Sequence, residues 1–410
     1  TNPYGMSGGW KWINIPYEEQ LKIKQEQVKE SLEYLKKYQT NIANLFSPIL
    51  ASPQIDGYRN KVEFSFGKYI SAKEEVEKHF QVGFHKQGEF SKIDDMQGCP
   101  LIDEEQNEIY REIKTFSKTL GLPVYDQKTG KGFFRHIMIR KTYFSNQAMI
   151  LLGFHPGYLK NHPEINSNEI FDTIKDFFQT LANKYPIITS IYLSHNANKA
   201  DICIGDLECI YGSETITEKL HDLEFQISPT SFFQTNSAGA QLLYDQVIQM
   251  ADIHTLPSQT VLDLYGGTGT IGMIFAKKGA QKVYSVELVT SASQDGEKNA
   301  TKNNLENIEF INAKVEDFLG NFLSQGHTAD LLIIDPPRSG MHPKALEDIL
   351  KFGTKNMIYV SCNPATLARD CEYILQNSSY NIIQIQAVDM FPHTHHIETI
   401  VLLENMNNNY

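Results

Sequence analysis

A glycine-rich run between an apolar strand and a helix constrains the fold of this chain most. Residues 261–272 read Val-Leu-Asp-Leu-Tyr-Gly-Gly-Thr-Gly-Thr-Ile-Gly, and a helix is predicted over 273–278. Glycines at such a turn let a ligand approach the backbone at the N-terminus of a helix. Further strands alternate with helices up to residue 387. This alternation predicts an α/β fold, with a doubly wound, Rossmann-like domain and a parallel sheet over residues 226–410.

The glycine-rich run fits two kinds of cofactor site. Gly267, Gly269 and Gly272 spell GxGxxG, and Glu287 ends the next predicted strand about 20 residues on, as in dinucleotide sites. A nicotinamide-dependent oxidoreductase is therefore one hypothesis. An S-adenosylmethionine site explains more, because Asp263 precedes the glycines as in the Asp-x-x-x-Gly-x-Gly turn of adenosylmethionine enzymes. Glu287 would then bind the ribose hydroxyls.

Two later strands end in reactive residues at the edge where doubly wound sheets bind substrates. The strand 331–334 runs into Asp335, two prolines and Arg338. Amino-group methyltransferases carry an aromatic residue at the position of Arg338, so this pattern argues against methylation of an amino group. The next strand, 357–361, delivers Cys362 to the same edge. A thiol there suits the methylation of uracil, because C5 is a poor nucleophile until a thiolate adds to C6.

A carboxylate at the last strand suits the second half of this chemistry. The C5 proton must leave after methyl transfer, and Glu398 is the candidate base. Three histidines precede it, at positions 393, 395 and 396, without a strong metal-ligand spacing. We expect them to serve in loop packing or RNA contact, and we predict no metal.

The first half of the chain predicts two further parts. Residues 17–38 carry apolar residues at helical spacing, so residues 1–45 are interpreted as an N-terminal helical segment whose charges form a solvated face. Residues 46–225 combine strand-like alternation with two helical stretches. This pattern predicts a central α+β domain, which we interpret as RNA-binding.

Charge alone argues against a nucleic-acid partner, because the net charge is −12 and phosphate affinity needs clustered Lys and Arg. The stretch 127–163, however, contains no Asp or Glu and interleaves basic with aromatic residues. This composition favours a surface for phosphate contact and base stacking, with Lys131, Arg135 and Arg140 as candidates. An ordinary hairpin with a basic outer face is the alternative.

Together these motifs resemble the RNA uracil-5-methyltransferase family, in the same order and at comparable separations. The motifs are Ser231-Phe-Phe-Gln-Thr-Asn236, Asp263 to Gly269, Asp335-Pro-Pro-Arg338, Ser361-Cys-Asn-Pro364 and His396-Ile-Glu-Thr399. Residues 17–22 resemble the family's helix before the central domain, and 57–64 its opening strand. The amino-acid sequences of residues 228–234 and 267–272 are most similar to those of the eukaryotic-type tRNA (uracil-5)-methyltransferases.

The resemblance implies roles for individual residues. Cys362 would be the nucleophile and Glu398 the proton acceptor. Arg59 and Arg338 join the candidate RNA contacts. The residues implied to bind S-adenosyl-L-methionine are Gln234, Tyr265, Gly267, Gly269, Thr270, Glu287 and Asp335. Thr270 stands where bacterial members often have Asn, which leaves its cofactor contact open.

The resemblance also implies partners. The small N-terminal barrel of some ribosomal members is missing here, which favours tRNA over ribosomal RNA as substrate. Some members hold an iron–sulfur cluster with four cysteines, but only Cys99 lies in a comparable setting, so we predict no cluster. A non-catalytic RNA-binding protein is a further hypothesis, against which Cys362 and Glu398 argue.

The odd number of scattered cysteines predicts a reducing compartment, and the lack of a long apolar run predicts no membrane partner. We also expect a monomer. We expect a cytoplasmic location, with nuclear and mitochondrial ones open.

Overall fold

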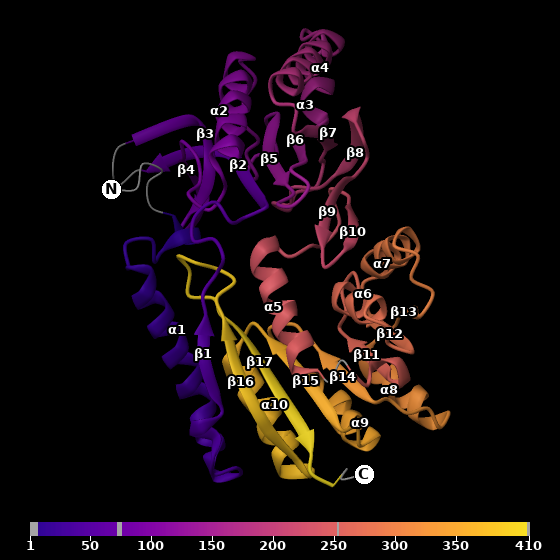
Figure 1. Ribbon diagram of the computed structural model, residues 1–410. Coiled ribbons are helices and arrows are strands. Elements are labelled where there is room, and N and C mark those ends of the chain that lie inside the picture. Colours follow the sequence, from indigo (N-terminus) through magenta and orange to yellow (C-terminus); the bar gives the residue numbers. More distant parts are fainter. Residues whose placement is uncertain (1–6, 72–75, 252–253, 408–410) are drawn as a thin grey trace.

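Two large sheets with helices packed against them make up most of the molecule (Figure 1). The computed structural model describes residues 7–71, 76–251 and 254–407. Within these residues, the C-terminal sheet has the strand order β1-β16-β17-β15-β14-β11-β12-β13, and the central sheet has the order β4-β3-β2-β5-β6-β7-β8. A separate hairpin, β9 and β10, lies between them in the chain. The predicted fold class is confirmed.

The C-terminal sheet contains every strand that the sequence predicts there. Its strands are β1 (Phe46–Leu50), β11 (Thr260–Leu264), β12 (Lys282–Glu287), β13 (Ile308–Asn312), β14 (Leu331–Ile334), β15 (Asn356–Ser361), β16 (Tyr380–Val388) and β17 (Glu398–Asn405). Its helices are α1 (Tyr17–Leu32), α5 (Ser237–Met250), α6 (Thr270–Lys277), α7 (Thr290–Lys302), α8 (Val315–Ser324), α9 (Pro343–Phe352) and α10 (Pro364–Asn377). The four residues of β14 are all buried, as expected for a parallel strand covered on both faces.

The central domain has a mixed sheet and helices. Its strands are β2 (Lys61–Ser71), β3 (Val76–Lys86), β4 (Glu89–Asp95), β5 (Phe134–Lys141), β6 (Ala148–Phe154), β7 (Ile188–His195) and β8 (Asp206–Gly212). The helices are α2 (Glu104–Thr119), α3 (Gly157–Lys160) and α4 (Ser167–Lys184), and the hairpin is β9 (Ile216–Leu220) with β10 (Leu223–Ile227).

Short 3₁₀ turns lie outside the central domain, at η1 (Gly8–Trp10), η2 (Glu33–Lys37), η3 (Ile42–Asn44) and η4 (Leu256–Ser258).

The N-terminal segment differs from its predicted place at one boundary. Strand β1, with which the central domain was expected to start, pairs in parallel with β16 of the C-terminal sheet. Helix α1 runs beside β1 and packs against α10 (Figure 1). The reason is that β16 would otherwise present an unpaired edge, which β1 covers. Residues 17–50 therefore belong structurally with the C-terminal half.

Strand direction brings the reactive ends together. Strands β11, β12, β14 and β15 are mutually parallel, so their carboxyl ends meet at one edge. Strand β17 is antiparallel and lies between β15 and β16, with Thr399 opposite Ser361. The first residue of β17 thus reaches the edge at which β15 ends. None of the described helices combines the length and apolar character that crossing a bilayer requires.

Candidate active site

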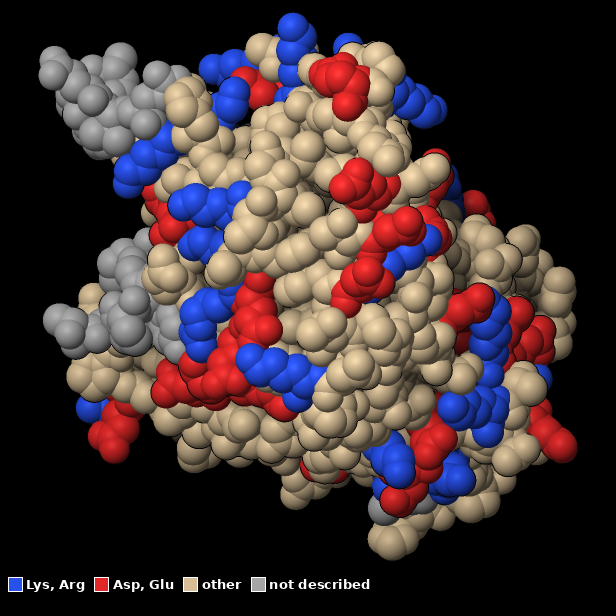
Figure 2. All heavy atoms as spheres, turned by 90° about the horizontal axis from the view of Figure 1, so that it is seen from above, with Lys and Arg blue, Asp and Glu red and all other residues tan. Residues whose placement is uncertain are grey.

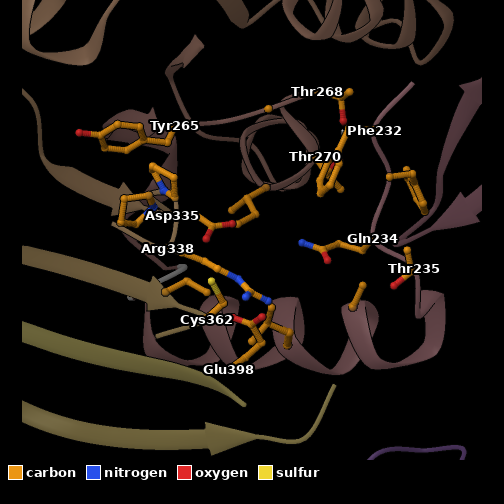
Figure 3. Close-up of a pocket in the computed structure, with 18 of the residues that line it drawn as sticks. Phe232, Gln234, Thr235, Tyr265, Thr268, Thr270, Asp335, Arg338, Cys362 and Glu398 are labelled. Carbon is orange, nitrogen blue, oxygen red and sulfur yellow. Dashed lines mark hydrogen bonds between the residues drawn. The ribbon is translucent and has the colours of Figure 1, made fainter. Parts of the chain in front are cut away.

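A cavity of about 980 Å³ opens at this edge of the C-terminal sheet. Figure 3 shows Gln234, Asp335, Cys362 and Glu398 turned toward a common space. Ten of the predicted residues line the cavity: Arg59, Gln234, Tyr265, Gly267, Thr270, Glu287, Asp335, Arg338, Cys362 and Glu398. Residues from the central domain and from both halves of the C-terminal sheet therefore share one site.

The glycine-rich turn is wound through left-handed backbone conformations. Tyr265, Gly267 and Gly269 have φ values of 61°, 58° and 70°. No atom lies within 4 Å of the position that a Cβ of Gly267 would take, whereas a Cβ at Gly269 would lie 2.3 Å from the ring of Phe310. Gly267 thus exposes backbone to the cavity. Gly269, which does not line the cavity, acts through the turn that it makes possible.

Two acids brace this turn in different ways. The buried Oδ2 of Asp263 accepts hydrogen bonds from the amide of Gly272 at 3.1 Å and from Ser285 Oγ at 2.9 Å. Burial raises the pKa of Asp263 to about 6. Glu287 accepts from the amides of Gly267 at 3.0 Å and Val289 at 2.7 Å, and it also lines the cavity. A carboxylate at this strand end suits ribose hydroxyls, so the turn and Glu287 fit an adenosyl cofactor.

The thiol and its predicted base are close neighbours in the sheet. Cys362 follows β15 directly and Glu398 begins β17, so each adjoins the paired residues Ser361 and Thr399. Figure 3 shows both side chains at the same end of the cavity, with the guanidinium of Arg338 beside them. Cys362 is half-buried, whereas Glu398 is only 8% exposed.

Burial and charge set the protonation of this group. Burial, and then the negative charge of Asp335, raise the pKa of Glu398 well above its ordinary value. Burial, and then Glu398, raise the pKa of the Cys362 thiol, while Arg338 lowers it. Burial, and then Asp263, raise the pKa of Asp335 to about 7. Arg338 is therefore the cation that favours the thiolate and the carboxylate.

Local hydrogen bonds fix the loops that carry these residues. Asn363 caps α10 through its side-chain oxygen, which accepts from the amide of Ala365 at 3.1 Å. Its Nδ2 donates to the carbonyl of Arg338 at 3.0 Å, so the two strand ends are tied together. Arg338 Nη2 lies 3.3 Å from Nδ1 of His396. The pKa of His396 is lowered to about 4, chiefly by burial, so the ring is neutral at neutral pH and can accept this bond.

The central-domain arginines are not where the sequence predicted them. Arg135 and Arg140 are 2% and 3% exposed. Arg135 donates to the carbonyls of Asn196, Asn198 and Ala200. Their prediction as phosphate contacts is wrong, because both guanidinium groups are buried and bind backbone. Lys131 is exposed but does not line the cavity.

Some cavity residues escaped the sequence analysis. Lys11 lines the cavity next to Trp10, which is buried against Phe84 of the central domain with ring centroids 5.5 Å apart. In the sequence, the only local sign of a functional role for Lys11 is its position between Trp10 and Trp12. Of the three histidines before Glu398, His395 and His396 line the cavity, whereas His393 packs behind it.

Comparison with known proteins places this site in a family. The family model described as tRNA (Uracil-5-)-methyltransferase matches residues 16–406. The chain belongs to this family. An uncharacterized RNA methyltransferase of Fusobacterium nucleatum is 39% identical over 97% of this chain and 80% of its own length. A second, from Caldanaerobacter subterraneus, is 35% identical over 98% of this chain and 83% of its own length.

A solved structure of similar fold adds the cofactor. The Pyrococcus abyssi tRNA (uracil-54, C5)-methyltransferase in complex with S-adenosyl-L-homocysteine is 28% identical. The alignment of the two structures covers 97% of this chain and 86% of the Pyrococcus abyssi chain, with a TM-score of 0.75. The chain is thus an S-adenosylmethionine-dependent RNA uracil-5-methyltransferase. The predicted family, enzyme class and cofactor are confirmed, and the nicotinamide hypothesis is set aside.

Proposed function

We propose that this enzyme methylates C5 of a uridine in tRNA, the T-loop uridine at position 54, with Cys362 as nucleophile and Glu398 as base. The substrate follows the Pyrococcus abyssi tRNA (uracil-54, C5)-methyltransferase, which aligns along 97% of the chain. One observation carries the residue roles. Cys362 and Glu398 line the same cavity as the glycine-rich turn. Ribosomal RNA is the alternative substrate.

The reaction runs through a covalent adduct. The Cys362 thiolate adds to C6 of uracil, and the electron pair of the C5–C6 double bond moves toward C5 and O4. S-adenosylmethionine, when bound, supplies the methyl group that C5 takes up. Glu398 then removes the proton from C5, the C5–C6 double bond re-forms, and the C6–S bond breaks to return the thiolate.

The electrostatics of the cavity suit both steps. Arg338 lowers the pKa of the thiol and of Glu398. Because burial and Asp335 raise the pKa of Glu398, its carboxylate is a stronger base than an exposed one. A single cation beside both groups therefore supports the nucleophile early in the cycle and the base late in it.

Cations around the cavity support RNA binding there. Lys11, Arg59 and Arg338 all line it. Figure 2, which views the molecule from the side of the central domain, shows basic and acidic side chains interspersed rather than separated. We therefore propose that phosphate contacts concentrate at the mouth of the cavity, where the central domain contributes Arg59.

We also propose a monomer without an iron–sulfur cluster. Burial raises the pKa of Cys99 to about 11, so this residue is a thiol at neutral pH. Cluster ligands are thiolates, and a protonated, buried Cys99 that packs in the core supports a structural role instead.

Two substitutions test the residue roles, because they stop the cycle at different points. Cys362→Ala forms no adduct, whereas Glu398→Gln adds the thiolate and transfers the methyl group but retains the C5 proton. Denaturing gels with radiolabelled tRNA should show a methylated protein–RNA band that persists for Glu398→Gln and is missing for Cys362→Ala. Turnover by Glu398→Gln should fall about 100- to 10,000-fold. Cys209→Ala, outside the cavity, is the control.

The same gels define failure of the proposal. Parental turnover by Cys362→Ala would exclude a covalent mechanism through this thiol. Parental turnover by Glu398→Gln without trapped RNA would assign the base to another group. Methylation of ribosomal RNA in preference to tRNA would change the substrate while leaving the residue roles intact.

A further inference from the structure

The hairpin between β16 and β17 forms one wall of the cavity. Val388, the last residue of β16, pairs with Glu398, the first residue of β17, so residues 389–397 form the connecting loop. Figure 1 shows this loop rising from the C-terminal sheet toward the central domain. It contributes Phe391, Thr394, His395 and His396 to the cavity. The loop thus lies in the cavity wall and leads directly into Glu398.

One face of helix α1 is polar and yet turned inward. Tyr17, Gln20 and Lys24 are spaced three and four residues apart, so they lie on the same side of the helix. Gln20 and Lys24 are both 0% exposed. The solvated face that the sequence predicted for this helix therefore does not include them. Their polar atoms need partners inside the protein.

The partners of Lys24 and Tyr17 lie at the base of the hairpin. Lys24 Nζ donates to Asp389 Oδ1 at 2.7 Å and to the carbonyl of Phe391 at 3.0 Å. Tyr17 Oη donates to Asp389 Oδ2 at 2.9 Å. Neither Lys24 nor Asp389 is exposed. Asp389 directly follows Val388, so this buried ion pair sits beside the point from which Glu398 starts.

Gln20 holds the middle of the hairpin. Its Oε1 accepts from the amide of His393 at 2.7 Å, and its Nε2 lies 3.1 Å from His393 Nδ1. The amide of Trp12 donates to the carbonyl of His393 at 3.0 Å. His393 has φ 64°, a conformation that costs a residue with a side chain about 1 kcal/mol or more. These contacts stabilise a backbone that the loop would not adopt alone.

A buried ion pair contributes little to net stability, but it fixes the relative positions of the two segments that carry its charges. Removing two charges from water costs several kcal/mol, and apolar residues of similar size are often as stabilising. Movement of the hairpin away from α1, however, would leave Lys24 and Asp389 buried and unpaired. Cys362 is held by other side-chain contacts, since the side-chain hydrogen bonds of Ser361 and Asn363 join its own loop, the start of α10 and the loop of Arg338. Helix α1 therefore acts on the base side of the cavity.

We propose that Lys24 and Gln20 are positioning residues that fix the hairpin 389–397 and so aim Glu398 at the C5 proton of the adduct. This inference rests on the proposed function of Glu398. It places the N-terminal helix in control of the second half of the covalent cycle, in which the C5 proton leaves and the C6–S bond breaks. Thiolate addition depends on Cys362 and proceeds without this helix contact.

Rapid quenching on denaturing gels measures the two halves separately. Lys24→Met and Gln20→Leu should slow the breakdown of the methylated adduct about 10- to 100-fold, as expected for a misplacement of about 1 Å. The rate of adduct formation should stay within about threefold of the parent, because the side chains of Ser361 and Asn363 that hold the Cys362 loop bond to that loop, to α10 and to the loop of Arg338 rather than to Lys24 or Gln20. Lys22→Ala, on the exposed face of the same helix, should leave both rates unchanged.

A double variant separates positioning from folding. Lys24→Met with Asp389→Asn leaves no unpaired charge, so it should fold as the parent does in a thermal melt, yet its adduct should still break down slowly. Parental breakdown in this variant, or equal loss of both steps in the single variants, would overturn the proposal. If Glu398→Gln itself traps no adduct, it is the proposed function that fails.

Discussion

Arginines at two places in this enzyme look alike in the sequence and serve different ends. Arg140, on β5 of the central domain, is buried and donates to the carbonyls of Ser228 and Ser231 at 3.0 Å each. Arg338, after the prolines of the C-terminal half, is exposed and lines the cavity beside Cys362. The guanidinium of Arg140 donates hydrogen bonds to backbone carbonyls, whereas that of Arg338 presents its charge to the cavity.

The difference teaches what a basic stretch can and cannot predict. The partners of Arg140 lie about ninety positions later in the chain, where the chain crosses from β10 to α5. Carbonyls in such a crossing need donors when they are buried, and an arginine supplies several at once. The acid-free stretch 127–163 thus contains arginines whose guanidinium groups are already engaged with backbone carbonyls.

The largest effect that we predict for these arginines is on the free energy of unfolding. Arg140→Met should lower the free energy of unfolding by about 2–4 kcal/mol, because it removes two charged hydrogen bonds and leaves the carbonyl of Ser228 with the amide of Ser231 as its remaining donor. Chemical denaturation measures the loss. The folded fraction should bind tRNA like the parent, and Lys131→Ala, which is exposed, should unfold as the parent does. Weaker tRNA binding at unchanged stability would return Arg140 to the RNA surface.

The next effect is on the pH dependence of catalysis. Arg338 lowers the pKa of Cys362 and of Glu398, so Arg338→Ala raises both and moves the acid limb of kcat/KM to higher pH. At neutral pH the rate should fall about 10- to 100-fold and recover in part as pH rises. Arg338→Lys keeps the charge and should shift the limb less. A uniform loss at every pH would instead mean that Arg338 only binds RNA.

The smallest effect concerns RNA affinity. Arg59→Ala should weaken tRNA binding about fivefold and reduce the slope of log K against log salt by about 0.7–0.9, the value for one phosphate contact. Binding of S-adenosylmethionine should not change. Filter binding at several salt concentrations measures the slope, with Lys131→Ala as the matched control. An unchanged slope for Arg59→Ala would remove this residue from the phosphate contacts.

Much of the site could be predicted because its residues end predicted strands. Glu287 ends β12, whereas Asp335 and Cys362 directly follow β14 and β15. These strands are parallel, and parallel strands deliver such residues to one edge. Arg135 and Arg140 could not be placed, because period-two alternation does not say which carbonyls a long side chain will reach. Lys24 was misjudged for the same reason, since its buried partner Asp389 lies 365 residues away.

The sequence by itself determined the doubly wound half, the glycine-rich turn and the candidates proposed as nucleophile and base, since local periodicity and motif chemistry carry that information. Only the tertiary structure decided that β17 runs antiparallel beside β15, which brings Glu398 next to Cys362. It also decided that β1 and α1 join the C-terminal sheet and hold its last hairpin. Strand neighbours and buried ion pairs depend on contacts between distant segments, which no local pattern encodes.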